Sequence, residues 1–283
     1  MNKNTIRNFI QKALEEDVGE GDFTTLATIP ENVFGEANLY VKEKGILAGV
    51  SIAKEIFQFI DPKSVVEIYI PDGTYCDGNN NVAFKVFSNI RILLKVERLV
   101  LNILQRMSGI ATITNQYVKA VEETKAKILD TRKTTPGFRY FEKLAVKIGG
   151  GCNHRMGLYD QILIKDNHID FAGGIDEALK RTKNYLEKHS LKLPVECEAR
   201  NIDDVIKILK YDFVETILLD NFTIEQTKEA VKLISNQKKI ESSGGINLSN
   251  VRDYALCGVD YISIGSLTHH VRSLDLSLKA KLK

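Results

Sequence analysis

Hydrophobic and polar positions divide the chain into two parts with different rhythms. The first segment, MNKNTIRNFIQKALEEDV, places four apolar side chains on one face of an amphipathic helix: Ile6, Phe9, Ile10 and Leu14. Short β-rich runs follow up to about residue 96, separated by DG and GNNN turns: ANLYVKEKGILAGV, SVVEIYI and NVAFKVF. This mixture predicts a small α+β domain.

The second part opens with a long helical stretch, ERLVLNILQRMSGIATITNQYVKAVEET, whose apolar residues cover more than one face and which we expect to link two domains. From residue 127 onward, short apolar runs alternate with helical segments: AKILD, QILIKD, LPVECEA, ETILLDN, KKIESSGG and YISIGS. This alternation predicts parallel strands with crossover helices, and the number of repeats favours an α/β barrel. An open doubly wound sheet is the alternative, but no strand is followed by GxGxxG.

Length, charge and cysteine usage narrow the class of protein. A chain of 283 residues suits one large barrel, or a barrel with a smaller domain. The net charge of +2 does not indicate a nucleic-acid or membrane-surface protein. No apolar run approaches the roughly 20 residues of a membrane span, and the N-terminus does not resemble a signal peptide, so we expect a cytoplasmic protein. The four cysteines form no CxxC pair, which predicts reduced thiols.

Cations cluster just after the first two apolar runs of the second part. In parallel α/β folds the active site is built at the carboxyl ends of the strands. Arg132 and Lys133 follow the first run, and Arg155 and Lys165 lie near the second. A single lysine or arginine at such a position is more often a solvent-exposed loop residue than a ligand-binding one. Together, buried at successive strand ends, they would need an anionic partner, so the cluster predicts a polyanionic ligand.

Acidic residues and small residues follow at the ends of the later runs. Glu198 and Asp220 either hold Mg²⁺ bridged to substrate oxygens or neutralise the nearby cations, and spacing alone does not decide between these readings. The alternation of side chains along a strand makes Glu196 a competitor of Glu198. The last two runs end in small residues that let backbone N–H groups approach a phosphate: Ser243, Gly244 and Gly245, then Gly265 and Ser266.

Two further features carry less weight. His269 and His270 lack a third ligand of suitable spacing, so we interpret them as a solvated pair. Cys152 lies two residues from His154 but has no activating third group, so we interpret it as a packed thiol.

Six segments in this order resemble the carboxylating nicotinate-nucleotide pyrophosphorylases, a family also called quinolinate phosphoribosyltransferases. They are EEDVGEGD from Glu15, ERLVLN from Glu97, DTRKTTPGFR from Asp130, GGGCNHRMGLYDQILIKDNH from Gly149, LLDNF from Leu218 and SSGGI from Ser242. The resemblance spans nearly the whole chain, and the DTRKT and NHR…LIKDNH blocks are specific to it.

The resemblance implies an irregular six- to seven-stranded α/β barrel with an N-terminal α+β open-faced sandwich domain. The expected domains are residues 1–112 for the sandwich, 113–270 for the barrel with the active site, and 271–283 for a segment returning to the N-terminal domain. It also implies a homodimer, or a higher homo-oligomer, in which the active site borrows from the partner subunit.

The family further implies roles for individual residues. Quinolinate would be held by Arg132, Lys133, His154, Arg155 and Lys165, with Arg98 offered by the other subunit. Glu198 and Asp220 would meet the ribose hydroxyls and Mg²⁺, and Glu198 is preferred to Glu196 because family members place the second glutamate of this strand there. The loops at Ser243–Gly245 and Gly265–Ser266 would bind the 5′-phosphate of phosphoribosyl pyrophosphate.

The implied reaction joins quinolinate to phosphoribosyl pyrophosphate and yields nicotinate mononucleotide, pyrophosphate and CO₂ in de novo NAD biosynthesis. The residues expected to take part in catalysis are Lys133, Lys165, Glu198 and Asp220. Three alternatives remain: a related pyrophosphorylase associated with molybdate transport, a non-catalytic phosphate-binding barrel, and a barrel aldolase that uses Lys165 as a Schiff-base nucleophile.

Overall fold

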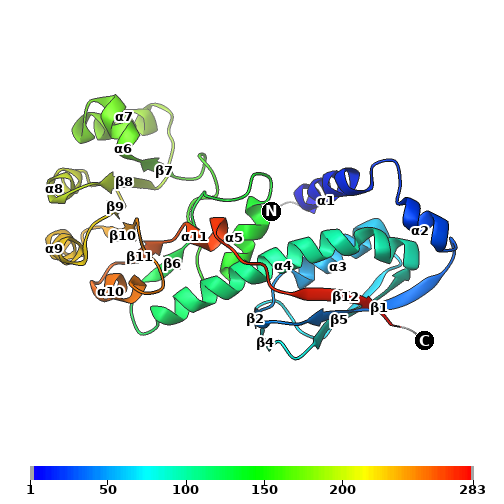
Figure 1. Cartoon of the computed structure of the whole chain (residues 1–283). Coiled ribbons are helices and arrows are strands. Elements are labelled where there is room, and N and C mark those ends of the chain that lie inside the picture. Colours follow the sequence, from blue (N-terminus) through cyan, green and yellow to red (C-terminus); the bar gives the residue numbers. More distant parts are fainter. Residues whose placement is uncertain (1–2, 282–283) are drawn as a thin grey trace. The chain divides into compact units, whose positions relative to one another are not determined.

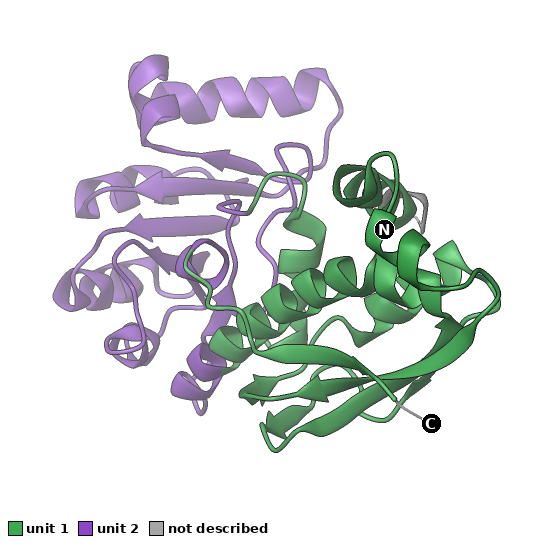
Figure 2. Ribbon diagram, turned by 45° about the vertical axis from the view of Figure 1, so that its right-hand side comes forward, with its two compact units in different colours: residues 1–115, 135–150, 270–283 green, residues 116–134, 151–269 purple. Residues whose placement is uncertain are grey.

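A computed structural model of the chain describes residues 3–281, with side chains from Ile6 onward. Met1 and Asn2 of the predicted N-terminal helix, and Leu282 and Lys283 of the predicted C-terminal segment, lie outside the described residues. The chain divides into two compact units, coloured separately in Figure 2. Unit 1 comprises residues 1–115, 135–150 and 270–283, and unit 2 comprises residues 116–134 and 151–269.

This division differs from the expected domains mainly at residues 135–150, which belong to unit 1. The segment contains helix α5 (Arg139–Ile148). Its Phe141 packs on Phe9 with ring centroids 4.7 Å apart, and its Glu142 pairs with Arg106 at 2.8 Å. These contacts explain why a segment between two barrel strands groups with unit 1, and no local sequence pattern reveals them.

Unit 1 contains a four-stranded antiparallel sheet in the order β12-β1-β5-β3. Its strands are β1 (Phe34–Val41), β3 (Val65–Ile68), β5 (Asn81–Asn89) and β12 (Leu276–Ala280). A separate two-stranded pair consists of β2 (Lys44–Ile46) and β4 (Tyr75–Asp77). The C-terminal strand β12 therefore completes a sheet whose other strands come from the first 89 residues.

Helix α3 (Val50–Ile60) and the first part of α4 (Ile90–Ala120) cover one face of this sheet (Figure 1). Helices α1 (Lys3–Val18), α2 (Phe23–Thr28) and α5 lie on the same side, and α1 packs on α3. Leu39 and Phe84, paired across β1 and β5, are fully buried, whereas Phe87 and Val65 on the opposite face are 42% and 61% exposed. One covered and one open face make this the expected open-faced sandwich.

A carboxylate distant in sequence fixes the start of α3. The helix begins after Gly49, which has φ 101°, and Asp72 accepts hydrogen bonds from the backbone N–H groups of Gly49 and Val50 at 2.6 and 2.8 Å. Asp72 thereby satisfies N–H groups that have no partner inside the helix. The apolar positions Ile52, Ile56 and others at helical spacing then face the core.

Unit 2 contains six parallel strands in the order β6-β11-β10-β9-β8-β7. They are β6 (Lys127–Leu129), β7 (Ile162–Ile164), β8 (Val195–Ala199), β9 (Thr216–Asp220), β10 (Lys239–Ser243) and β11 (Tyr261–Ser263). Each of the six predicted apolar runs forms one strand, which confirms the strand predictions. Between β6 and β7 the described residues form no ladder, and a bridge from Leu129 to Cys152 extends the β6 edge.

Helices connect successive strands and lie on the outside of the sheet (Figure 1). They are α6 (Asp166–Ala172), α7 (Ile175–Lys188), α8 (Ile202–Leu209), α9 (Ile224–Ile234) and α10 (Val251–Leu256). The short helix α11 (Ser266–His269) instead follows β11, the last strand of unit 2. Val205 and Ile208 of α8 are fully buried, as is Ile217 of β9. The expected α/β barrel architecture is thus present in its six-stranded, irregular form.

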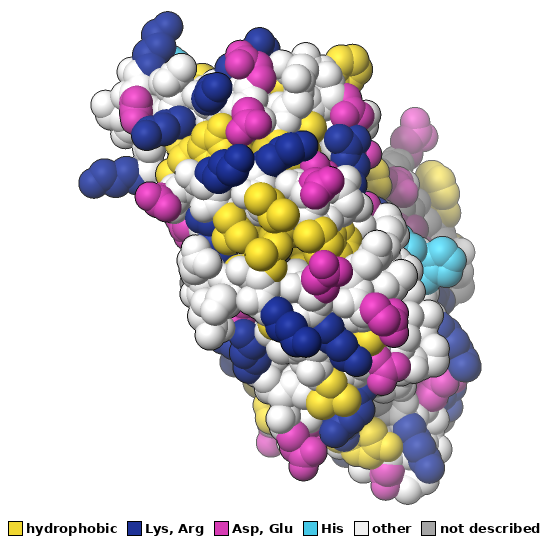
Figure 3. All heavy atoms as spheres, turned by 90° about the vertical axis from the view of Figure 1, so that its left-hand side faces the viewer, with side chains coloured by type: hydrophobic (Ala, Val, Ile, Leu, Met, Phe, Trp, Pro, Cys, Tyr) yellow, Lys and Arg dark blue, Asp and Glu magenta, His cyan; other side chains and the backbone are white. Residues whose placement is uncertain are grey.

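The outer surface and the cysteines agree with the sequence. The face shown in Figure 3 mixes Lys and Arg with Asp and Glu around hydrophobic patches, so it carries no continuous basic surface. Cys76, Cys152, Cys197 and Cys257 are all free thiols, as predicted. Within residues 3–281, no helix combines the length and the apolar character that crossing a membrane requires.

Candidate active site

A pocket of about 840 Å³ lies at the carboxyl ends of the strands of unit 2. Its volume is in the range of small-molecule sites. Eleven of the thirteen residues predicted for the site line it: Arg132, Lys133, His154, Arg155, Lys165, Asp220, Ser243, Gly244, Gly245, Gly265 and Ser266. The rule that places active sites at strand ends therefore brings together residues that are up to 134 positions apart in the sequence.

The pocket cations come from two neighbouring stretches of chain. Arg132 and Lys133 follow β6, Arg155 lies in the loop before β7, and Lys165 comes directly after β7. Among the described residues, no carboxylate lies within ion-pair distance of Arg132, Lys133 or Lys165. Their charges are available to an anionic ligand.

The predicted burial of these cations is wrong for three of them. Arg132, Lys133 and Lys165 are exposed, and only Arg155 is half-buried, because the pocket is open. Burial and the positive charge of Arg132 lower the pKa of Arg155. The exposure of Lys165 also removes the basis of the aldolase alternative, which needs a desolvated lysine. The argument for an anionic ligand therefore depends on the clustering of these cations. It also depends on the lack of a carboxylate within ion-pair distance of Arg132, Lys133 and Lys165.

Glu198 and Asp220 stand at the ends of adjacent strands, β8 and β9. Asp220 lines the pocket, whereas Glu198 is only 4% exposed and is not among the lining residues. The backbone N–H of Asp166 donates to Glu198 Oε1 at 3.2 Å. Burial and the negative charge of Asp220 raise the pKa of Glu198. Two carboxylates that repel each other at strand ends form a donor set that fits a divalent cation.

Glu196 and Glu198 do not exclude one another. Residues two apart in a strand point to the same face, so the predicted competition between them was wrong. Both are buried in β8, on either side of Cys197. Glu196 lies deeper along the strand and contacts His154.

Small residues form the part of the pocket beyond β10 and β11. Gly244 has φ 90°, and a Cβ there would collide with the side chain of Asn221. A Cβ on Gly265 would come within 3.0 Å of Lys133 Cδ and 3.1 Å of His269 Nε2. Glycine is therefore required at position 244, whereas at position 265 a larger residue would make the side chains of Lys133 and His269 shift.

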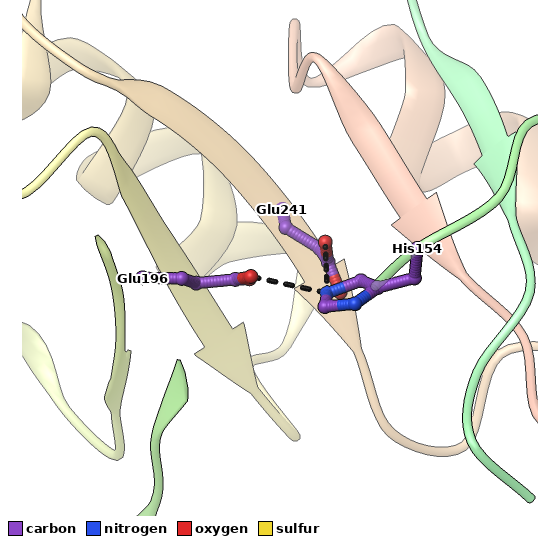
Figure 4. A group of neighbouring side chains, drawn as sticks. All are labelled: His154, Glu196 and Glu241. Carbon is purple, nitrogen blue, oxygen red and sulfur yellow. Dashed lines mark hydrogen bonds and ion pairs between the residues drawn. The ribbon is translucent and has the colours of Figure 1, made fainter. Parts of the chain in front are cut away.

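A buried trio lies beside these loops: His154, Glu196 and Glu241 (Figure 4). His154 Nε2 is 3.0 Å from Glu196 Oε2 and 3.4 Å from Glu241 Oε2. Burial lowers the pKa of His154, but hydrogen bonds to both glutamates outweigh burial and raise it to about 10. Burial and the charge of Glu241 raise the pKa of Glu196 to about 7.

Ligand atoms of the trio lie within 4.8 Å of one another, a spacing that a metal ion could bridge. The orientation of the imidazole argues against a metal there. The backbone N–H of Arg155 lies 2.8 Å from His154 Nδ1, so the neutral ring carries its proton on Nε2, and the protonated ring carries one there as well. Nε2 faces both carboxylates and would have to lose that proton to bind a metal. We interpret the trio as hydrogen-bonded.

Asp130 fixes the backbone beneath the trio. This fully buried residue follows β6 and accepts hydrogen bonds from the backbone N–H of His154 at 2.9 Å and from Asn153 Nδ2 at 2.5 Å. The first residue of the DTRKT block thus anchors the NHR block. Hydrogen bonds therefore connect two of the segments that carry the family resemblance, although these segments are separated in the sequence.

Arg98 does not line this pocket. It belongs to unit 1, where it lines a second pocket of about 730 Å³ together with Lys12, Glu16, Asp17 and Asn102. Except for Lys12, these residues come from the EEDVGEGD and ERLVLN segments. The two N-terminal segments of the resemblance therefore converge within unit 1.

Several lining residues escaped sequence reasoning, notably Asn221, His168, Glu241 and His269. His269 is part of the pair interpreted as solvated, but the short helix α11 returns it to the pocket beside Gly265. No pattern signals such a return. Glu241 could have been found, because an acidic residue inside the buried run of β10 needs a polar partner.

The chain matches two models of known protein families. The description "Quinolinate phosphoribosyl transferase, N-terminal domain" matches residues 22–108, and the description "Quinolinate phosphoribosyl transferase, C-terminal domain" matches residues 110–279. Together the two models cover most of the chain.

Similar proteins extend this finding. The chain is 44% identical to a mitochondrial "Quinolinate phosphoribosyltransferase [decarboxylating] 2" of Nicotiana glauca, over 97% of the chain and 82% of the relative. It is 38% identical to a "Probable nicotinate-nucleotide pyrophosphorylase [carboxylating]" of Bacillus subtilis, over 100% of the chain and 96% of the relative. The crystal structure of NadC from Streptococcus pyogenes is similar with a TM-score of 0.92 and 35% identity, covering 99% of each chain.

Proposed function

The chain belongs to the quinolinate phosphoribosyltransferase family, and we propose that the pocket of unit 2 is where it converts quinolinate and phosphoribosyl pyrophosphate to nicotinate mononucleotide, pyrophosphate and CO₂. The observation that carries this proposal is a cluster of cations, three of them with no carboxylate at ion-pair distance among the described residues. The cluster lies beside two small-residue loops and the strand-end carboxylate of Asp220. Such a pocket suits a dicarboxylate together with a phosphorylated sugar.

Quinolinate binding is assigned to the cationic side of the pocket. Arginine holds a carboxylate with two parallel charge-assisted hydrogen bonds, so Arg132 and Arg155 suit the two adjacent carboxylates of the substrate. Lys133 and Lys165 supply further donors, and His154 completes the set of residues assigned to quinolinate. The lowered pKa of Arg155 reflects burial and the crowding of positive charge next to Arg132, which a dianionic ligand relieves.

Phosphoribosyl pyrophosphate is assigned to the opposite side. The loops at Ser243–Gly245 and Gly265–Ser266, with His269 beside them, would bind the 5′-phosphate through backbone N–H groups and the imidazole. Glu198 and Asp220 would bind the ribose hydroxyls and Mg²⁺. When bound, Mg²⁺ neutralises charge on the departing pyrophosphate.

The reaction then proceeds in two balanced steps. The ring nitrogen of quinolinate forms a bond to the anomeric carbon, and the bond from that carbon to pyrophosphate breaks, with the electron pair leaving on pyrophosphate. Glu198 and Asp220 favour the positive charge of an oxocarbenium-like transition state. Next the bond to the 2-carboxylate breaks, CO₂ leaves, and the electron pair on ring carbon 2 takes up a proton. Lys133 and Lys165 would shield that developing negative charge.

A homodimer with shared active sites is also proposed, on the basis of Arg98. This arginine lines the separate pocket of unit 1 with three residues of the family-specific segments, Glu16, Asp17 and Asn102. Mixing Arg98→Ala subunits with Lys165→Ala subunits tests the idea: shared sites restore part of the activity, and self-contained sites restore none.

The cytoplasmic location expected from the sequence remains a prediction. Several relatives carry mitochondrial or chloroplastic names, including those from Nicotiana glauca and rice. Fractionation of the source cells, followed by detection of the protein, would decide it.

The proposed function is tested by incubating the purified protein with quinolinate, phosphoribosyl pyrophosphate and Mg²⁺. Nicotinate mononucleotide and CO₂ should appear in equal amounts, and chelation of the metal should stop both. Binding of phosphoribosyl pyrophosphate without either product would mean that the acceptor is not quinolinate.

A further inference from the structure

We propose that Glu196 is a positioning residue that sets the orientation of both His154 and Arg155, and thereby the affinity of the pocket for a dicarboxylate. The inference rests on the proposed function, because it assumes that these two side chains hold quinolinate. Glu196 is 1% exposed, and its Oε2 contacts His154 and Gln161, so its effect on the substrate passes through these neighbours.

One oxygen of Glu196 links two separate positions of the loop before β7. Oε2 lies 3.0 Å from His154 Nε2 and accepts a hydrogen bond from Gln161 Nε2 at 2.8 Å. The first contact holds the imidazole directly. The second holds Gln161, the residue just before strand β7.

Gln161 passes this restraint to Arg155. The backbone carbonyl of Gln161 accepts a hydrogen bond from Arg155 Nη1 at 3.1 Å. His154 and Arg155 are also joined directly, since the backbone N–H of Arg155 donates to His154 Nδ1. His154, Arg155, Gln161 and Glu196 therefore form one closed hydrogen-bonded circuit, and Glu196 is its most deeply buried member.

The second buried glutamate strengthens the assignment. Glu241 Oε2 lies 3.4 Å from His154 Nε2 and limits the space on the other side of the imidazole. Among the described residues, Oε1 of Glu196 and Oε1 of Glu241 have no hydrogen-bond partner. Burying two incompletely satisfied carboxylates is unfavourable for stability, and apolar residues of similar size are often equal or better in such places. Stability therefore does not explain why these two glutamates are buried here, whereas the positioning of His154 and Arg155 does.

The structure also predicts which substitution is tolerated. A glutamine amide oxygen can accept two hydrogen bonds, as Oε2 of Glu196 does, so Glu196→Gln can keep both His154 and Gln161 in place. Leucine has a similar size but accepts neither. Glu196→Gln and Glu196→Leu therefore separate the hydrogen-bonding role from the space-filling role.

The experiment measures kcat and the KM of each substrate for the wild type, Glu196→Gln, Glu196→Leu and Gln161→Leu. For Glu196→Leu we expect the KM of quinolinate to rise about 10- to 100-fold, since two hydrogen bonds to a charged group are lost. The KM of phosphoribosyl pyrophosphate should stay near the wild-type value. Glu196→Gln should recover most of the lost affinity, and Gln161→Leu should show a smaller rise of the same kind.

A destabilised control distinguishes positioning from general damage. Ile208→Ala removes a fully buried side chain of α8 outside the pocket, and it should lower thermal stability without raising the KM of quinolinate. An unchanged KM of quinolinate in Glu196→Leu, or an equal rise for both substrates, would overturn the inference. If Glu196→Leu does not fold, Gln161→Leu decides by the same comparison. A wild type without quinolinate turnover would instead refute the proposed function itself.

Discussion

Unit 1 and the pocket of unit 2 treat charged side chains in opposite ways. In unit 1, the fully buried Glu142 accepts hydrogen bonds from Arg106 at 2.8 and 3.1 Å and from the backbone N–H of Thr135 at 3.0 Å. In the pocket, neither Arg132 nor Lys165 has a carboxylate within ion-pair distance among the described residues. Paired charges of unit 1 stabilise the fold, whereas those of the pocket remain available to a ligand. Substitutions in the two places should therefore affect different properties.

The largest expected effect is on turnover, from Arg132→Ala. Loss of a bidentate carboxylate ligand removes two charge-assisted hydrogen bonds of roughly 1.5–3 kcal/mol each, so kcat/KM for quinolinate should fall by about 100-fold or more. Thermal stability should not fall, because no ion pair is broken. Arg181→Ala, which removes an exposed cation paired with Glu177 on α7, should leave turnover unchanged. Intact quinolinate turnover and affinity in Arg132→Ala would refute the assigned role.

The matching change in unit 1 should act on stability. Arg106→Ala leaves the carboxylate of Glu142 buried without its cation, and the free energy of unfolding should fall by about 3 kcal/mol. Denaturant unfolding measures this loss. Arg272→Ala breaks an exposed pair with Glu43 and should cost about 1 kcal/mol or less. Equal losses from the two variants would contradict the contrast between buried and exposed pairs.

A third prediction concerns the small-residue loop after β10. Gly244→Ala brings a Cβ against Asn221 at a φ of 90°, so the loop must move and the KM of phosphoribosyl pyrophosphate should rise about tenfold. Gly245 has φ 63° and open space around a Cβ, so Gly245→Ala should have a smaller effect. A larger effect at Gly245 than at Gly244 would show that the collision with Asn221 is not the cause.

A fourth prediction is a pH dependence of stability that arises from His154. Its pKa is raised from 6.5 to about 10 in the folded protein, so the stabilisation is complete below about pH 6.5 and is lost as pH rises toward 10. Unfolding measured across this interval should show stability declining with pH in the wild type. The decline should be shallower in His154→Gln, which cannot titrate. Parallel curves would mean that His154 has no raised pKa.

The sequence was most informative where a single physical rule applied. Parallel strands place their carboxyl ends together, so the positions of Arg132, Lys165 and Asp220 after apolar runs were enough to predict that they share a pocket. The same rule says nothing of how far a side chain is buried, and for this reason Lys165 was wrongly expected to lie buried.

Features set by tertiary contacts were not accessible in this way. The grouping of residues 135–150 with unit 1 depends on Phe141 and Glu142 meeting residues of α1 and α4. His269 reaches the pocket through the four-residue helix α11, and Glu196 acts through Gln161, whose contact with a residue 35 positions away no local pattern reveals. In each case the partner is distant in sequence, and only the folded chain identifies it.

The most direct test of the contrast between the units is thermal unfolding of the wild type and of Arg132→Ala, each with and without quinolinate. If the pocket cations serve a dicarboxylate, quinolinate raises the Tm of the wild type, and nicotinate, with one carboxylate, raises it less. Arg132→Ala should have the same Tm as the wild type without ligand and a much smaller shift with it. A variant that is destabilised without ligand yet shows the full quinolinate shift would contradict the account.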